Sequence, residues 1–264
     1  MPTPEPLLLG LDIGTSRIKA LLVDRAGGEV RVEARATPFV TRSEGVEMTV
    51  GLLDEATASV VRAMGDLRGR VVGVGIAGMA ESGAPLGAAD EALGPVLAWH
   101  DPRGSDVVAR LVDRFGDELA GWIGQPVRTV SSVAKLGWLV DHGVTGVTNW
   151  AGVPELCLRR LTGVQVTEYS LAARTGWYHV RERRYLPEVA RAIGPRLGPE
   201  VFLPVEPAGR AMGRLSADGA TWSGLPVGIP VTLAGHDHLV GMVGSGAGPD
   251  DAVNSVGTAE SVLR

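Results

Sequence analysis

The sequence predicts an α/β domain in which helices flank a mixed β-sheet. Three apolar strand-like segments come first, at residues 7–13, 17–23 and 30–36, with short turns between them. From residue 52 onward, segments with apolar residues at helical spacing alternate with further strand-like segments. Consecutive strands give antiparallel neighbours, whereas strands joined through helices give parallel ones, so a mixed sheet is expected.

The elements between residues 50 and 140 follow from hydrophobic periodicity. A helix is expected to begin near Thr49 or Asp54, because apolar residues recur at helical spacing from 53 to 67. The continuous apolar segment 71–77 predicts a strand near the centre of the sheet. Three more elements are expected in this region: a strand at 96–99, an amphipathic helix around 107–115, and a helix with its N-terminus at Ser131 or Ser132.

The second half of the chain is predicted from the same signals. Residues 154–161 should form a helix, with Pro154 in the first turn, where its missing N–H group is tolerated. Residues 181–207 are rich in Arg, Glu and Pro and are expected to form helix and loop on the surface. Residues 227–233 should form a strand, and Pro230 near its middle predicts an edge position or a bulge.

Composition excludes several classes of function. The 264 residues are 45% apolar with a formal net charge of −5, which fits one large or two small globular domains and disfavours nucleic acid or an anionic membrane as partner. Cys157 is the single cysteine, so no internal disulfide is expected, and its apolar neighbours predict a buried thiol. No signal peptide is visible, and no apolar stretch approaches the ~20 residues of a membrane span, so a cytoplasmic protein is expected.

The turn after the first strand contains residues suited to binding a phosphate group. Asp12 ends the strand, Gly14 allows close approach of the backbone, and Thr15 and Ser16 add hydroxyl donors. A carboxylate beside a phosphate needs a cation between them, which implies Mg²⁺. The alternative is an ordinary hairpin turn, and this segment alone does not decide between the two.

A second group of such residues lies near the other end of the chain. Asp237 follows a strand and precedes a helix, where its carboxylate can accept a proton from a substrate hydroxyl. The alternative for Asp237 is a helix N-cap. Gly257 and Thr258 follow another strand-like segment and repeat the Gly-Thr pattern of the first turn. A dinucleotide-binding fold is disfavoured, because the first turn leads into a strand and no Gly-x-Gly-x-x-Gly opens a helix there.

Six segments, in chain order, resemble the motifs of one known family. They are 12–15 with Lys19; 95–103 with Trp99-x-Asp101-x-Arg103; 135–139 with Lys135 and Trp138; 160–175 with Leu161-Thr162-Gly163, Ser170 and Thr175; 235–237; and 257–258. Together they resemble the FGGY carbohydrate kinases, in the superfamily of actin and hexokinase, over nearly the whole chain. The resemblance implies an actin-like (ribonuclease H-like) fold and transfer of the γ-phosphoryl group of ATP to a hydroxyl of a sugar or polyol.

The resemblance also implies roles for single residues, with ATP and Mg²⁺ as cofactors. Asp237 would be the general base, and Asp12 would hold Mg²⁺ through water. The contacts to phosphate oxygens would come from Gly14, Thr15, Ser16, Gly257 and Thr258.

Glu81 is predicted to bind the substrate, because it follows the central strand where the family places sugar-binding residues. The segment Met79-Ala80-Glu81 matches neither the xylulokinase-like pattern Gln-Met-His nor the glycerol-kinase-like pattern Gln-Arg-Glu in full, so the identity of the sugar stays open. The alternative for Glu81 is a solvated loop acid.

Three further residues are predicted to lie near the substrate. His236 is expected to face it, with metal binding by His236 and His238 as the alternative. Trp99 and Asp101 are also candidates, the alternative being a core tryptophan and an ion pair between Asp101 and Arg103.

The resemblance covers only the first of two actin-like domains. Residues 1–264 are therefore expected to form the N-terminal sugar-binding and catalytic domain without the C-terminal nucleotide-binding domain, and with little or no turnover alone. The alternative is a non-catalytic sugar-binding or regulatory module, which the retention of Asp12, Thr15 and Asp237 disfavours. A homodimer is compatible with the sequence.

Overall fold

A six-stranded mixed sheet forms the centre of the computed structural model, which describes residues 5–256 and 260–264. Its strands are β1 (Leu7–Ile13), β2 (Arg17–Val23), β3 (Glu29–Ala36), β6 (Val71–Gly78), β14 (Gly213–Arg214) and β15 (Pro230–His236). They lie in the order β14-β15-β6-β1-β2-β3. β1 is antiparallel to β2 and parallel to β6, and β6 is parallel to β15, as a mixed sheet requires.

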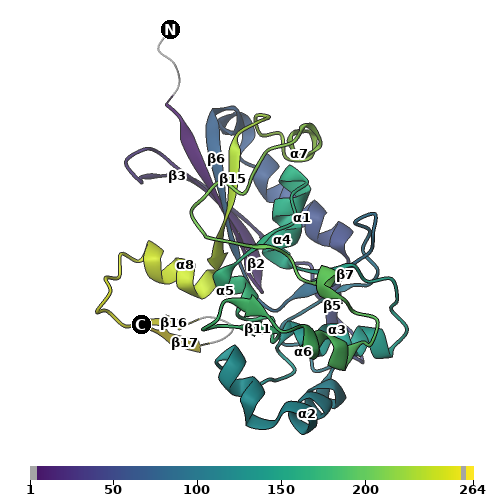
Figure 1. Cartoon of the computed structure of the whole chain (residues 1–264). Coiled ribbons are helices and arrows are strands. Elements are labelled where there is room, and N and C mark those ends of the chain that lie inside the picture. The colour runs from purple at the N-terminus through teal and green to yellow at the C-terminus, as the bar shows by residue number, and fades with distance from the viewer. Residues whose placement is uncertain (1–4, 257–259) are drawn as a thin grey trace.

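Helices pack on one face of this sheet. They are α1 (Val50–Arg62), α4 (Val153–Thr162) and α7 (Ala217–Ser223), which gather on the same side in Figure 1. α1 begins where the sequence predicts, because the Thr49 hydroxyl accepts a hydrogen bond from the backbone N–H of Leu52. The predicted helix at 154–161 corresponds to α4, with Pro154 in its first turn.

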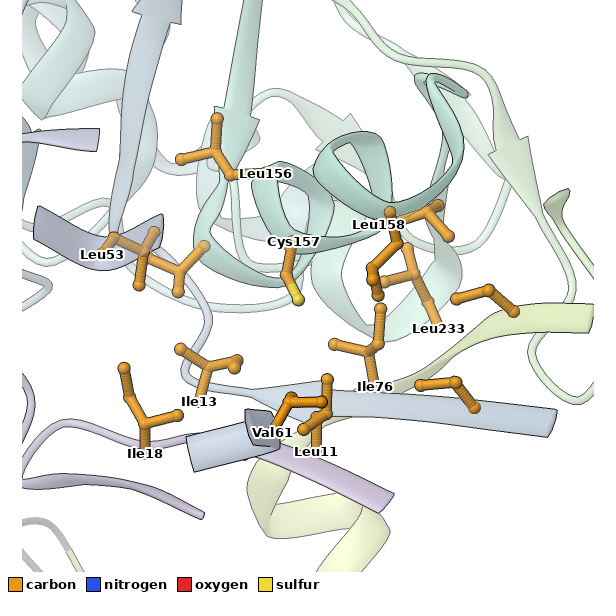
Figure 2. Close-up of a cluster of buried hydrophobic side chains, with 14 of the residues drawn as sticks. Leu11, Ile13, Ile18, Leu53, Val61, Ile76, Leu156, Cys157, Leu158 and Leu233 are labelled. Atoms are coloured by element: carbon orange, nitrogen blue, oxygen red, sulfur yellow. The ribbon is translucent and has the colours of Figure 1, made fainter. Parts of the chain in front are cut away.

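The main hydrophobic core lies between these helices and the sheet. Alternate residues of β1, such as Leu11 and Ile13, are buried and face the helices, and Leu156 and Leu158 of α4 lie over them (Figure 2). Each fully buried aliphatic side chain of this kind contributes about 1.5–3 kcal/mol to folding. Cys157 lies in the same core, as its apolar neighbours predict, and burial raises the pKa of its thiol.

A second sheet and a second core lie beyond the ends of these strands. The sheet has the order β4-β5-β8-β7-β9, with β4 (Val40–Thr41), β5 (Val46–Met48), β7 (Gly83–Leu86), β8 (Val96–Leu97) and β9 (Asn149–Gly152). The helices around the second core are α2 (Ser105–Ile123), α3 (Ser132–Asp141) and α6 (Pro187–Ile193).

The segment 181–207, expected on the surface, also contributes buried side chains to the second core. Leu186, Val189 and Ile193 pack in the second core, and Leu197 joins them. The apolar residues recur every three or four positions among the charged ones, so α6 is amphipathic and buries one face while its charges face solvent.

The last strand of the main sheet differs from its prediction. β15 begins at Pro230 and ends at His236, and it is the second strand from the edge because β14 pairs with it. Pro230 is its first residue, a position that tolerates the missing N–H group. The register with β6 shifts between Leu233 and Gly235, so the irregularity lies at the carboxyl end of the strand rather than at the proline.

The remaining elements complete the chain. They are β10 (Thr167–Glu168), α5 (Tyr169–Ala172), β11 (Tyr178–His179), β12 (Arg184–Tyr185), β13 (Val205–Glu206), α8 (Asp237–Gly244), β16 (Val253–Val256), β17 (Glu260–Leu263) and the 3₁₀ helices Gly65–Arg70 and Pro199–Val201. Among the described residues, no helix combines the length and the apolar character needed to cross a membrane.

Candidate active site

A cleft of about 950 Å³ opens at the carboxyl ends of the three parallel strands β1, β6 and β15. Open α/β sheets commonly bind ligands at this end of their strands. The predicted site residues that line the cleft are Asp12, Gly14, Thr15, Ser16, Glu81, Trp99, His236 and Asp237. Segments from both ends of the sequence therefore meet at one surface.

The β1–β2 connection is a tight turn whose side chains face the cleft. The Gly14 N–H group donates to the Arg17 carbonyl (3.1 Å), and the Thr37 hydroxyl donates to the Gly14 carbonyl (2.6 Å). A Cβ at Gly14 would lie 3.0 Å from the Arg17 carbonyl oxygen, so the turn is too tight for most side chains. The hairpin geometry and a phosphate-facing role are therefore compatible.

Asp12 has one carboxylate oxygen paired and the other without a partner. Its Oδ2 forms an ion pair with the Lys19 Nζ (3.0 Å), whereas its Oδ1 is buried and has no hydrogen-bond partner within the described part of the chain. Burial raises the pKa of Asp12, and the charge of Asp237 acts in the same direction. An unpaired buried carboxylate oxygen is a suitable ligand for a hard cation or its water shell, so Asp12 fits the predicted Mg²⁺ role.

Asp237 is the first residue of α8, and the turn before it is held by hydrogen bonds. His236, not Asp237, is the N-cap residue of α8, so the N-cap alternative for Asp237 does not hold. The His236 N–H group donates to the Ser170 hydroxyl (2.9 Å), which anchors the turn to α5. The Asp237 Oδ1 accepts from the His238 N–H group (2.8 Å) and lies 3.2 Å from the His236 Nε2. The carboxylate is thus positioned by its two histidine neighbours.

The two histidines lie in different environments. Burial lowers the pKa of His236 to about 4, so its imidazole is neutral at pH 7. The His238 Nδ1 lies 2.7 Å from the Ser255 hydroxyl. Side-chain atoms of His236, Asp237 and His238 lie within 4.8 Å of one another, so the metal-binding alternative is geometrically open.

Glu81 is buried and paired, not a solvated loop acid. Its Oε1 accepts from the Arg174 Nε (2.6 Å) and lies 2.5 Å from the Arg174 Nη2. Burial raises the pKa of Glu81, and the guanidinium of Arg174 opposes this effect. Sequence analysis missed Arg174, because its partner lies 93 positions away and no local pattern links them.

The structure separates the two candidates of the 95–103 segment. Trp99 lines the cleft, and its Nε1 donates to the Thr15 hydroxyl (2.8 Å). Asp101 does not line the cleft: it accepts from the Val46 N–H group and forms an ion pair with Arg103 (2.6 Å), the alternative that the sequence left open. Asp101 is 1% exposed, and its carboxylate holds the loop after β8 through these contacts.

Lys135 forms a hydrogen bond with the backbone of Trp99. It is fully buried, and its Nζ donates to the carbonyl groups of Trp99 and Thr129 (3.0 Å each). Burial lowers the pKa of Lys135 to about 8. These contacts give Lys135 a structural role. Gly257 and Thr258, predicted to contact phosphate, lie outside the described residues.

Comparison with solved structures shows that the chain shares its fold with parts of known sugar kinases. A xylulose kinase from Rhodospirillum rubrum superposes with a TM-score of 0.89 at 24% identity, over 97% of this chain and 55% of that one. A gluconate kinase from Lactobacillus acidophilus gives 0.88 at 22% identity, over 98% and 54%. Residues 7–244 match the sequence model of the FGGY family of carbohydrate kinases, N-terminal domain, and the chain belongs to this family.

Curated relatives agree with this assignment. An L-fuculokinase from Salmonella typhi is 28% identical over 98% of this chain and 56% of its own length. A xylulose kinase from Streptomyces rubiginosus is 30% identical over 97% of this chain and 54% of its own length. The chain thus spans about half the length of the curated relatives it matches, and the predicted family and actin-like fold are confirmed.

Proposed function

We propose that the protein carrying this chain transfers the γ-phosphoryl group of ATP to a hydroxyl of a sugar or polyol. The observation that carries the proposal is that Asp12 and Asp237 face one cleft from the ends of β1 and β15. The Asp12 carboxylate can act on the phosphate side of the cleft, and the Asp237 carboxylate can accept the proton of the substrate hydroxyl. Since ATP is the phosphoryl donor, we also propose that the reaction takes place in the cytoplasm.

Asp237 is the proposed general base. Its carboxylate accepts the proton of the attacking hydroxyl, a role that contributes about 10²–10⁴ in rate. The hydrogen bonds from the His236 N–H group to the Ser170 hydroxyl and from the His238 N–H group to Asp237 fix the carboxylate before substrate arrives. A carboxylate fixed in advance does not have to be reoriented during the reaction.

Asp12 and the turn after it form the proposed phosphate side. The unpaired Oδ1 of Asp12 would hold Mg²⁺ or its water, and the ion would neutralise charge on the phosphate oxygens. Thr15 and Ser16 lie on the same turn and line the cleft beside it. The Trp99 indole N–H group donates to the Thr15 hydroxyl, and this hydrogen bond connects the proposed phosphate side of the cleft with the proposed substrate side.

The test is Asp237→Asn in a protein that also carries the other half found in the relatives. Phosphorylation of sugars, followed by ADP release, should fall about 10²–10⁴-fold, because the amide cannot accept the proton. Sugar binding, measured by calorimetry, should change little. The exposed Asp113→Asn serves as control and should retain full activity. Equal loss of binding and turnover in Asp237→Asn would favour a binding module over a kinase.

A further inference from the structure

The substrate end of the cleft contains an ion pair between Glu81 and Arg174. Both residues line the cleft together with His236 and Asp237. The Arg174 side chain is 36% exposed and the Glu81 side chain 6%, so the arginine is the more accessible member of the pair. The pair is therefore accessible from the cleft.

Every nitrogen of the Arg174 guanidinium already has an acceptor. The Nε and Nη2 contact the Glu81 Oε1, and the Nη1 donates to the Gln125 side-chain oxygen (2.6 Å). A substrate carboxylate placed beside this pair would meet the repulsion of the Glu81 charge. The charge of Arg174 is thus neutralised within the protein.

Hydrogen-bonding capacity nevertheless remains on both members of the pair. A guanidinium has five N–H groups, so two of them remain after these three contacts. The Arg174 contacts to Glu81 involve Oε1, and Oε2 accepts no hydrogen bond from the residues that the structure describes. A free acceptor next to free donors matches a sugar hydroxyl, which donates and accepts at once.

The backbone at Glu81 supports a role in binding. Its φ is +63°, a conformation that a non-glycine residue adopts only when its surroundings impose it. The Ser132 hydroxyl donates to the Glu81 carbonyl (3.1 Å) and helps to hold this conformation. Strain of this kind is common where a side chain must be presented to a ligand.

We propose that Arg174 is a specificity-determining residue, and that the Glu81–Arg174 pair selects a neutral polyhydroxylated substrate over a sugar acid. This inference rests on the proposed function, since it assigns the substrate class of the same cleft. Glu81 and Arg174 would form hydrogen bonds with neighbouring hydroxyl groups of the substrate. Because Glu81 neutralises the charge of Arg174, a substrate carboxylate would gain no net attraction at this pair.

The test compares D-glucitol and D-xylulose with D-gluconate, by calorimetry on residues 1–264 and by phosphorylation in the protein that carries the relatives' other half. The wild type should prefer at least one neutral compound to gluconate by tenfold or more. Glu81→Gln removes the carboxylate that neutralises Arg174. It should therefore reduce this preference at least tenfold, because gluconate gains affinity for the unneutralised guanidinium. Arg174→Gln should weaken binding of the neutral compound about tenfold without improving gluconate.

The controls separate this inference from the proposed function. The exposed pair Arg110–Asp141 offers Arg110→Gln, which should leave the preference unchanged. A wild type that prefers gluconate, and loses this preference in Arg174→Gln, would overturn the inference while leaving a sugar kinase. Binding and phosphorylation that fail with all three compounds in a folded protein would overturn both. Circular dichroism of each variant verifies that the fold is retained.

Discussion

At the scale of single residues, Glu155 has an ionisable group buried in the core beneath the cleft. The Thr167 hydroxyl donates to its Oε1 (2.6 Å), and its Oε2 is buried without a hydrogen-bond partner among the described residues. Burial raises the pKa of Glu155 to about 7, whereas the unfolded chain releases this proton near 4.5. The folded state thus binds more protons between these values, so the free energy of unfolding should fall as pH rises from about 4.5 to 7.

We expect Glu155→Gln to stabilise the protein above pH 7 and to have little effect at pH 4.5. The amide does not ionise and still accepts from Thr167, so the ionisation cost, about 3 kcal/mol for a pKa raised from 4.5 to about 7, disappears. Chemical unfolding at pH 4.5 and pH 8 measures the difference, with the exposed Glu118→Gln as control. The same effect at both pH values would contradict the proposed protonation of Glu155.

At the scale of elements, the β15–α8 junction decides where Asp237 lies. Gly235 has a φ of +127°, and a Cβ there would lie 2.8 Å from the Ser170 hydroxyl oxygen. The same hydroxyl accepts from His236 and donates to Glu168, so crowding at Gly235 would disturb the anchor of the turn before Asp237. Strand β15, helix α5 and helix α8 are therefore coupled through one serine.

Gly235→Ala should lower the free energy of unfolding by about 1–3 kcal/mol, because it combines an unfavourable φ with a short contact. Turnover should fall as well, since Asp237 moves with its turn. Gly241→Ala in α8 is the matched control: apart from its own helix backbone and chain neighbours, no atom of the described residues lies within 4 Å of the added Cβ, and alanine favours a helix by about 1 kcal/mol. Unfolding and sugar phosphorylation are measured for both. A Gly235→Ala protein that is as stable and active as Gly241→Ala would refute the coupling.

At the scale of the whole molecule, an apolar surface lies beside the cleft. Val243 of α8 is 78% exposed, and Val256 and Val262 of the β16–β17 hairpin are each 75% exposed. α8 contacts both strands of this hairpin, and the three lie side by side in Figure 1. Exposed apolar side chains that gather in this way are typical of a surface that another part of a protein covers.

Residues 1–264 by themselves should therefore bind a sugar but phosphorylate it slowly. Adding the half of the relatives that lies outside the match should raise turnover at least 10²-fold, because closure of a cleft aligns the phosphoryl donor and excludes water. ADP release measures the effect on both proteins, and thermal unfolding verifies that residues 1–264 are folded alone. Equal turnover of the two would show that a second domain is not required.

The parts of the site that the sequence predicted are those carried by local patterns. The Asp12 turn and Asp237 each follow an apolar strand, and a strand that ends in such residues places them at the edge of a sheet whatever lies next to it. The order of the motifs then identified the family. Asp101 shows the limit of such local patterns. A Trp-x-Asp segment does not indicate where the carboxylate points, and in the structure this carboxylate binds Arg103 and Val46 and does not line the cleft.

The sequence by itself determined most of the elements around the sheet, among them β1, β2, β3, β6, α1 and α4, most of the residues predicted at the cleft, and the family. It could do so because hydrophobic periodicity and turn residues act within a few positions along the chain. Only the tertiary structure decided that Glu81 is paired with Arg174, that α6 buries one face in the second core, and that Ser170 anchors the turn before Asp237. Those features join segments tens of residues apart, and their energies arise from burial and charge pairing between surfaces that meet only after folding.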